Sequence, residues 1–302
     1  MSDSVRIFEV GPRDGLQNEK SLVSVADRIA FIEALLDAGL HTIEVGAFVS
    51  PKAIPQMVNS DQVLRGVSHR TDGEFEVLVP NEKGYEAARA AGAREIAVFA
   101  AASESFSCAN INCSIAESIE RFKPVMTRAR DDGIRVRGYV SCVLGCPYEG
   151  EIKPQAVVDV ASELWKLGCY EISLGDTIGV GTPAKTRQLL RAAAGVVPMA
   201  HLAMHFHDTY GQALANLYAG MEEGARVIDS AAGGLGGCPY APGATGNVAT
   251  EDVVYMLEGM GIATGVDMTK LLGATNEVSR LLSRPPVSRV VSALNAKVRA
   301  QS

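Results

Sequence analysis

The 302-residue sequence has no apolar run approaching the roughly 20 residues that a membrane-spanning helix needs. It also lacks an excess of positive charge, because 28 Lys and Arg stand against 35 Asp and Glu, a formal net charge of −7. A nucleic-acid-binding protein would present a basic face. We therefore expect neither a membrane protein nor a nucleic-acid partner.

Targeting signals and a cysteine framework are missing as well. The N-terminus, MSDSVRIFEVG, has neither the basic start and apolar stretch of a signal peptide nor the Arg-rich composition of a transit peptide. The six cysteines are then expected to be reduced thiols. Cys142 and Cys146 could form half of a zinc site, but no second pair answers them, which favours free thiols. The prediction is a soluble, cytoplasmic protein.

What the sequence does contain is a regular alternation of β-rich and amphipathic helical segments. Helices are expected at 24–39 and at 156–168, the second starting just after Pro154 and ending at Gly168. No GxGxxG motif opens a helix after the first strand, which disfavours a doubly wound open sheet. The count predicts a closed (β/α)₈ TIM barrel, with strands at 5–11, 42–48, 75–80, 95–101, 136–143, 171–177, 202–208 and 227–234.

The domain organisation follows from the absence of any linker or change of composition. The length would also suit two ordinary domains, but we expect a single catalytic domain over residues 1–302. About 5–265 would form the barrel, and about 266–302 a short helical cap with helices at 267–282 and 289–299. One further helix is expected around 247–260.

The barrel predicts where the chemistry lies, because active sites of this fold occupy the C-terminal ends of the strands and the loops that follow. The candidate residues at these positions are polar and come from distant parts of the chain. They are Arg13, Asp14, Glu44, Asn110, Asn112, Asp176, Thr177, His205, His207, Cys238 and Asn247.

The two histidines of LAMHFHDTYG (202–211) face the same side of a strand, because alternate strand residues share a face. Alone, the pair could be two core histidines with hydrogen-bond partners. Together with a carboxylate such as Asp14 and an amide such as Asn247, it makes a mixed N/O ligand set. That set suits Mg²⁺, Mn²⁺ or Zn²⁺, and the oxygen ligands favour the first two. Glu44 would either hold a ligand by hydrogen bond or form a buried salt bridge with Arg13.

The stretch GGLGGCPYAPGATGN (233–247) predicts a loop without regular structure that can approach a ligand closely and close over it. Its single cysteine, Cys238, would be either a solvated thiol or a group that faces the pocket. A thiol facing a closed, metal-bearing pocket could act as a general acid and protonate a carbanion or an enolate.

Several of these segments resemble the 3-hydroxy-3-methylglutaryl-CoA lyase family over about residues 5–265. The RDG and HxH elements alone are shared with isopropylmalate, homocitrate and citramalate synthases and some aldolases of the DRE-TIM metallolyase superfamily. The match in the cysteine loop is the specific one. The segments are EVGPRDGLQNEK (9–20), NINCSIAES (110–118), VRGYVSCVLGCPYEG (136–150), SLGDTIGVGTP (173–183), HFHDTYGQALAN (205–216) and GGLGGCPYAPGATGNVATEDVVYML (233–257).

The resemblance implies cleavage of 3-hydroxy-3-methylglutaryl-CoA to acetyl-CoA and acetoacetate with the help of Mg²⁺ or Mn²⁺. Arg13 would contact the substrate carbonyl and stabilise the enolate, and Cys238 would be the essential loop thiol. A base, Asp14 or His205, would remove the hydroxyl proton, and we also expect a catalytic role for Glu44. The implied cation ligands are Asp14, His205, His207 and Asn247, and the expected substrate contacts are Arg13, Asn110, Asp176 and Thr177.

One departure concerns the binding of coenzyme A. Where the family carries basic residues before NINCS, this chain has Ser107, Cys108 and Ala109. Surface lysines would then have to bind the phosphates of the CoA moiety, although each of them could equally be an ordinary solvated side chain. The three candidates are Lys20, Lys52 and Lys83.

Three other readings stay open at this point. One is a lyase for a longer branched 3-hydroxyacyl-CoA. Another is a Claisen-condensing synthase, which usually carries a long C-terminal regulatory extension that this sequence does not show. The third is a catalytically silent barrel that binds metal or acyl-CoA as a sensor. For all of them we expect a homodimer, which is common in this architecture.

Overall fold

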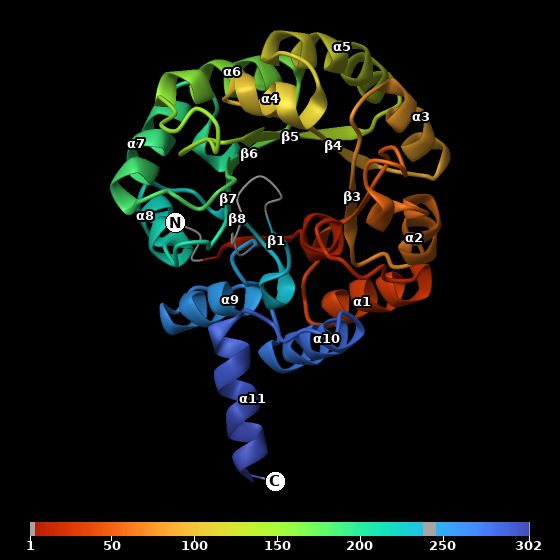
Figure 1. The fold of residues 1–302 in the computed structure, drawn as a ribbon, viewed down its shortest axis with the longest axis vertical. Helices are drawn as coiled ribbons and strands as arrows, with labels where there is room; N and C mark the ends of the chain where they lie inside the picture. Colours follow the sequence, from red (N-terminus) through yellow and green to blue (C-terminus); the bar gives the residue numbers. More distant parts are fainter. Residues whose placement is uncertain (1–3, 238–245, 302) are drawn as a thin grey trace.

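The computed structural model describes residues 4–237 and 246–301. Its eight strands pair in parallel in sequence order, and the eighth pairs with the first, so the sheet closes into a barrel (Figure 1). The expected TIM barrel is confirmed. The strands are β1 (Arg6–Glu9), β2 (Thr42–Ala47), β3 (Glu74–Leu78), β4 (Glu95–Ala101), β5 (Arg135–Ser141), β6 (Glu171–Asp176), β7 (Leu202–Phe206) and β8 (Val227–Ser230).

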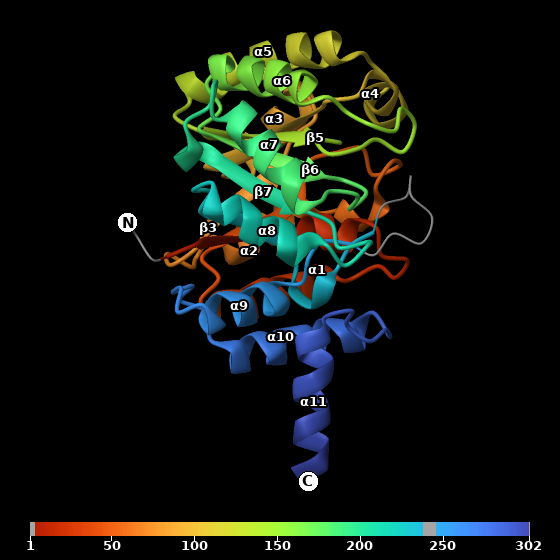
Figure 2. The same cartoon turned by 90° about the vertical axis from the view of Figure 1, so that its left-hand side faces the viewer.

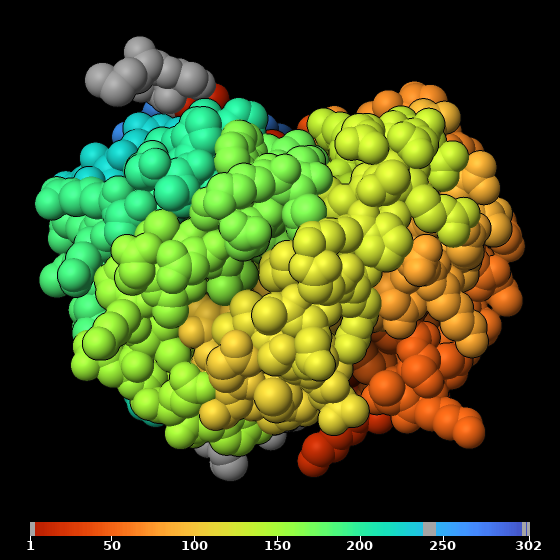
Figure 3. Space-filling model, turned by 90° about the horizontal axis from the view of Figure 1, so that it is seen from above, coloured from red at the N-terminus to blue at the C-terminus, as the bar shows by residue number. Residues whose placement is uncertain are grey.

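Helices follow the strands and cover the outside of the barrel. Figure 3 looks onto the helices of the yellow-to-green part of the chain, which pack side by side over this face. The α-helices are α1 (Val25–Asp37), α2 (Ser60–Val67), α3 (Glu82–Ala90), α4 (Glu104–Ile111), α5 (Ile115–Asp131), α6 (Pro154–Leu167), α7 (Pro183–Ala193), α8 (Ala213–Glu222), α9 (Thr250–Gly259), α10 (Met268–Leu281) and α11 (Arg289–Gln301). The short helical turns are η1 (Gly11–Gly15), η2 (Pro55–Met57), η3 (Met199–His201) and η4 (Ala232–Gly234).

Local sequence signals explain the ends of several helices. Pro154 occupies the first turn of α6, and Gly168 ends that helix with a left-handed φ of 105°, as the sequence predicts. Helix α5 starts with a capping box, in which Ser114 and Glu117 satisfy each other's backbone N–H groups.

Some predicted strands run past the observed ones, most clearly the first and the last. Strand β1 ends at Glu9; the Val10 N–H still donates to the Ser230 carbonyl, and the chain then turns into η1 at Gly11. Ala232–Gly234 likewise forms η4 instead of extending β8. These residues belong to the rim loops, where the chain bends to carry polar side chains over the barrel mouth.

A buried ionic layer fills the barrel interior below that mouth. Arg137 of β5 donates to Asp229 of β8 over 2.7 Å and to Glu171 of β6 over 2.8 Å, and its guanidinium lies 4.0 Å from the centre of the Phe8 ring. All of these side chains are essentially inaccessible to solvent. Charges this deep are tolerated because they are paired and hydrogen-bonded. The layer fixes Asp229 directly beneath the rim.

The C-terminal helices lie against one side of the barrel, where α10 packs on α1 and on η4. Arg284, after α10, forms an ion pair with Glu19 of the loop that follows η1. Helix α11 packs on α9 at its start and then extends away from the body of the molecule (Figures 1 and 2). None of the helices among the described residues has the combined length and apolarity that a bilayer crossing requires.

Candidate active site

A cavity of about 630 Å³ opens at the carboxyl ends of the strands. Its size is typical of small-molecule sites. Six of the residues predicted from the sequence lie in its wall. They are Arg13, Asp14, Asn110, Thr177, His205 and His207.

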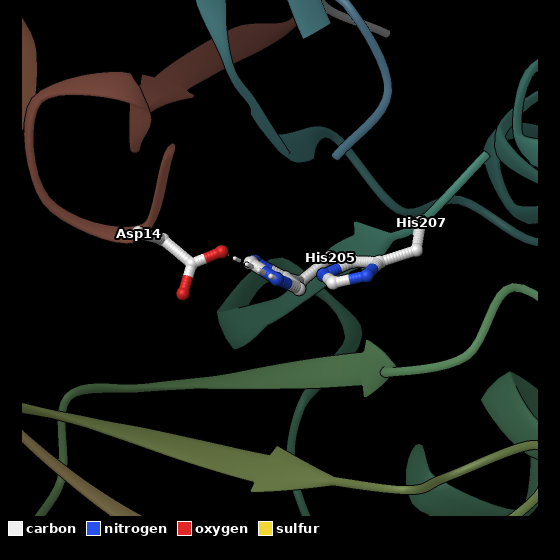
Figure 4. Close-up of side chains that lie close together, drawn as sticks. All are labelled: Asp14, His205 and His207. Atoms are coloured by element: carbon white, nitrogen blue, oxygen red, sulfur yellow. Dashed lines mark ion pairs between the residues drawn. The ribbon is translucent and has the colours of Figure 1, made fainter. Parts of the chain in front are cut away.

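Three side chains converge on one point of this wall. Asp14 projects from η1, and His205 and His207 project from the end of β7, so that the carboxylate faces the two rings (Figure 4). Each offers one ligand atom, and these atoms lie within 4.8 Å of one another. Among the described residues this is the group of acidic, His or Cys side chains whose geometry could hold a metal ion.

Asn247, at the other end of the glycine-rich loop, contacts this group. Its Nδ2 donates to Asp14 Oδ2 over 2.8 Å, while its Oδ1 is buried and has no hydrogen-bond partner in the described part of the chain. A buried amide oxygen without a partner is costly. A cation at this point would satisfy it, so the donor set fits a divalent ion.

The two histidines have different surroundings. His205 Nδ1 lies 3.3 Å from Asp229 Oδ2, the partner opposite it in the β7–β8 register, which leaves Nε2 directed toward Asp14. His207 Nδ1 is buried without a hydrogen-bond partner, and burial, followed by the neighbouring His205, lowers the pKa of His207 to about 4. Since metal ligation requires the neutral imidazole, His207 is in the right protonation state at neutral pH.

Arg13 connects the metal-ligand group to the barrel interior. Its Nη1 donates to Asp14 Oδ1 over 2.8 Å, and its Nε lies 2.7 Å from Glu44 Oε2. Burial alone would raise the pKa of Asp14, but the charges of Arg13 and the histidines outweigh it and bring that pKa to about 2. Of the two roles open for Glu44, the geometry is that of the buried salt bridge with Arg13.

Asp176 and Thr177, at the end of β6, turn in different directions. Thr177 lies in the cavity wall, and its Oγ1 accepts from the Cys142 N–H over 2.9 Å. Asp176 is absent from the cavity wall; it accepts from the N–H groups of Val180 and Gly181 in its own loop. Burial raises the pKa of Asp176 to about 6. A substrate contact by Asp176 stays a prediction.

The two ends of the glycine-rich loop lie back to back. Gly236 has a φ of 123°, and a Cβ added to Gly246 would overlap the backbone of Gly236. Gly237, the last residue described before the gap, lies in the cavity wall, and its carbonyl accepts from Asn18 Nδ2 over 3.0 Å. Cys238 lies outside the described residues, so its role stays a prediction.

The model of the HMGL-like family matches residues 4–278. The chain belongs to this family. A curated relative from Pseudomonas aeruginosa, named 3-hydroxy-3-isohexenylglutaryl-CoA/hydroxy-methylglutaryl-CoA lyase, is 58% identical over 293 residues, which are 97% of this chain and 98% of the relative.

Solved structures of the HMGL-like family agree with that assignment. A hydroxymethylglutaryl-CoA lyase from Pseudomonas aeruginosa superposes with a TM-score of 0.96 at 57% identity and covers 98% of this chain and 99% of its own. An HMG-CoA lyase from Acinetobacter baumannii, solved with coenzyme A and 3-methylmalate, has a TM-score of 0.93 at 36% identity. The match covers 97% of this chain and 96% of that structure's chain. The resemblance stated from the motifs is confirmed at the level of the family.

Sequence reasoning missed three residues of this HMGL-like site. Asp229 and Tyr139 are strand residues with buried polar groups, and Tyr139 lies edge-on to the His205 ring at 5.9 Å. Arg121 of α5 lies in the cavity wall. The available signal for Asp229 was a carboxylate inside an otherwise apolar strand, VID, which a barrel interior accepts only with partners.

The cysteines of the middle segment behave as expected. Cys142 and Cys146 are buried and form no disulfide with any residue that the structure describes, and Cys146 Sγ lies 3.0 Å from Ser103 Oγ. The three lysines that were candidates for CoA binding, in contrast, are exposed and do not line the cavity; they are Lys20, Lys52 and Lys83.

Proposed function

We propose that this protein is a 3-hydroxy-3-methylglutaryl-CoA lyase, which cleaves its substrate to acetyl-CoA and acetoacetate. The observation that carries the proposal is the convergence of Asp14, His205 and His207 beside the Arg13 guanidinium in a ligand-sized cavity. A retro-Claisen cleavage needs such a pairing, because charge develops first on the C3 oxygen and then on the thioester oxygen. Relatives that share more than half of its residues carry this activity in their names.

The proposed cofactor is Mg²⁺ or Mn²⁺. Asp14, His205, His207 and Asn247 would hold it, and the buried, unpartnered oxygen of Asn247 supports that role. When bound, the cation supplies Lewis-acid stabilisation of the substrate's C3 oxygen. The amide and carboxylate oxygens of the set favour these harder ions over Zn²⁺.

The protein's own groups would then handle the proton and the developing charge. Asp14 and His205 are the two proposed acceptors of the C3 hydroxyl proton. Asp14 lies in the cavity wall beside Arg13, and His205 directs its Nε2 toward Asp14 while Asp229 holds its Nδ1. After the C2–C3 bond breaks, Arg13 would stabilise the enolate oxygen, and Cys238 would protonate the enolate carbon.

A second candidate is a broader acyl specificity. The cavity wall also includes apolar side chains, among them Ile54 and Leu78. A longer branched substituent at C3 would find an apolar surface there. The Pseudomonas aeruginosa relative is named for both a methyl and an isohexenyl substrate. The synthase and sensor readings have no comparable support among the named relatives.

The remaining expectations belong to this proposal. The chain would act as one catalytic unit, with the barrel over about 5–265 and the helical cap over about 266–302. The N–H of Val5 bonds to the carbonyl of Ala263, and Arg284 pairs with Glu19, contacts that support one unit. A homodimer and a cytoplasmic location stay predictions; light scattering coupled to size-exclusion chromatography tests the first.

The deciding experiment is a coupled assay on metal-stripped protein, with 3-hydroxy-3-methylglutaryl-CoA as substrate. We expect acetoacetate only after Mg²⁺ or Mn²⁺ is added. The isohexenyl analogue, run in parallel, tests the broader specificity. Absence of product from both substrates in the presence of either cation contradicts the proposal.

A further inference from the structure

Arg121 is placed at the cavity by the helix that carries it. The helix before α5, α4, contributes Phe106 and Asn110 to the cavity wall. On α5, Phe122 is buried, and its ring lies 6.4 Å from that of Phe99. Neighbouring side chains on a helix diverge by about 100°. With Phe122 packed inward, Arg121 emerges along the wall of the same cavity.

Arg121 forms no ion pair with any residue that the structure describes, although its charge, after the hydrogen bonds from Ser114, contributes to the lowered pKa of Glu117. The other guanidinium in the cavity wall, Arg13, is held by Asp14 and Glu44. Glu117, one turn before Arg121, accepts from the N–H and the Oγ of Ser114 in the capping box instead of pairing with Arg121. Farther along α5, Lys123 pairs with Glu120, and Arg128 pairs with Glu86.

The chemistry of an acyl-CoA explains why such a cation would be needed. The substrate carries a diphosphate and a 3′-phosphate, and it must approach a protein with a net charge of −7. A guanidinium matches phosphate oxygens in a bidentate way and keeps its charge at any physiological pH. The ligand point at Asp14 and Arg121 of α5 border the same cavity, so one extended molecule can contact both.

We propose that Arg121 binds a phosphate group of the acyl-CoA substrate. The inference rests on the proposed function. It assigns to the cavity two ends, one for the acyl group at the ligand point and one for the CoA phosphates at Arg121. Lys20, Lys52 and Lys83, outside the wall, are not needed for it.

The test compares two thioesters of the same acyl group, one on coenzyme A and one on pantetheine, which has no phosphate. For Arg121→Gln we expect KM to rise at least tenfold with the CoA ester, because a charge-assisted contact is lost. With the pantetheine ester, KM should not change, and kcat should stay near the wild-type value with both. Arg121→Lys should recover part of the loss. Lys123→Gln, on the same helix, is the matched control.

Calorimetric titration with CoA alone gives a readout that needs no turnover. Wild-type protein should bind CoA at least tenfold more tightly than Arg121→Gln. Equal changes in KM for both thioesters, or unchanged CoA affinity, would overturn the assignment of Arg121. If wild-type protein cleaves neither ester, the proposed function fails, and the CoA titration still decides on Arg121. Wild-type protein that does not bind CoA overturns the assignment of Arg121, whereas the proposed function is decided by turnover alone.

Discussion

His205, in β7, and His207, just after it, face the same candidate metal site but have different surroundings. His205 is fixed from below by Asp229, whose own position depends on the buried Arg137. His207 has no such support and keeps a buried, unpartnered Nδ1. A metal-free explanation satisfies His205 but leaves His207 with a desolvation cost. His207 is therefore the sharper test of the metal site.

For His207→Ala we expect Mn²⁺ affinity, measured by calorimetry, to fall at least about 10- to 100-fold. Even the loss of a group that only hydrogen-bonds to a metal ligand lowers metal affinity by that factor. The melting temperature without metal should change little or rise, because a buried polar atom without a partner is removed. His69→Ala is the control, since His69 is exposed and far from the site in the sequence. Unchanged Mn²⁺ affinity would make His207 a core histidine.

Arg13 gives the second prediction at this scale. Arg13→Met should lower kcat by about 10²- to 10³-fold, the usual effect of losing one group that stabilises an oxyanion. KM should change much less, because the strongest contact forms only with the enolate. Steady-state kinetics at saturating cation measure both. A rise in KM at constant kcat would contradict the role. Arg13→Lys, which still neutralises Glu44, separates the chemical effect from destabilisation by an unpaired buried carboxylate.

At the scale of secondary-structure elements, the strands and the loops make different contributions to the candidate site. The strands supply fixed positions, and residues from η1, β7 and the far end of the glycine-rich loop meet there. The close approach of Gly236 and Gly246 brings Asn247 against Asp14. The base of the loop thus contributes Asn247 to the proposed ligand set.

Gly246→Ala tests this arrangement. The added methyl group would force the two ends of the loop apart and move Asn247, so we expect at least a tenfold loss of Mn²⁺ affinity with parallel loss of turnover. Gly259→Ala is a matched control, because a Cβ there meets no atom within 4 Å. Wild-type Mn²⁺ affinity in Gly246→Ala would show that the loop ends do not position the ligands.

For the whole molecule, Glu251 joins three parts of the chain. It lies in α9, accepts from the N–H of Gly233 at the base of the loop, and accepts from the hydroxyl of Thr275 in α10. The side chain is fully buried, and burial raises its pKa to about 7. The cap helix and the loop are therefore held by one carboxyl group.

This carboxyl group predicts a dependence of stability on pH. A raised pKa in the folded state favours the protonated form, so its contribution is complete below the ordinary value of 4.5 and is lost as pH rises through about 7. Wild-type protein should lose on the order of 3 kcal/mol of unfolding free energy between pH 5 and pH 8 relative to Glu251→Gln, which cannot ionise. Urea denaturation at both pH values measures it. Parallel pH profiles would contradict the prediction.

Much of the fold and part of the site could be predicted from the sequence. All eight strands were located, because a barrel strand is a short apolar run between turn residues. The convergence of Asp14, His205 and His207 was predicted because strand ends of this fold share one rim. Asp229 and Tyr139 could not be found in this way, since their importance depends on which residues of β5, β7 and β8 share a level of the barrel.

The sequence by itself determined the periodic pattern, the rim residues and the family motifs. All of these depend on neighbours along the chain or on the side-chain alternation of a single strand. Only the tertiary structure decided that Glu44 pairs with Arg13, that Asp176 turns into its own loop, and that Arg121 lies in the cavity wall. Those outcomes depend on strand register and helix packing, which bring together groups that lie far apart in the chain and whose charges then select their partners.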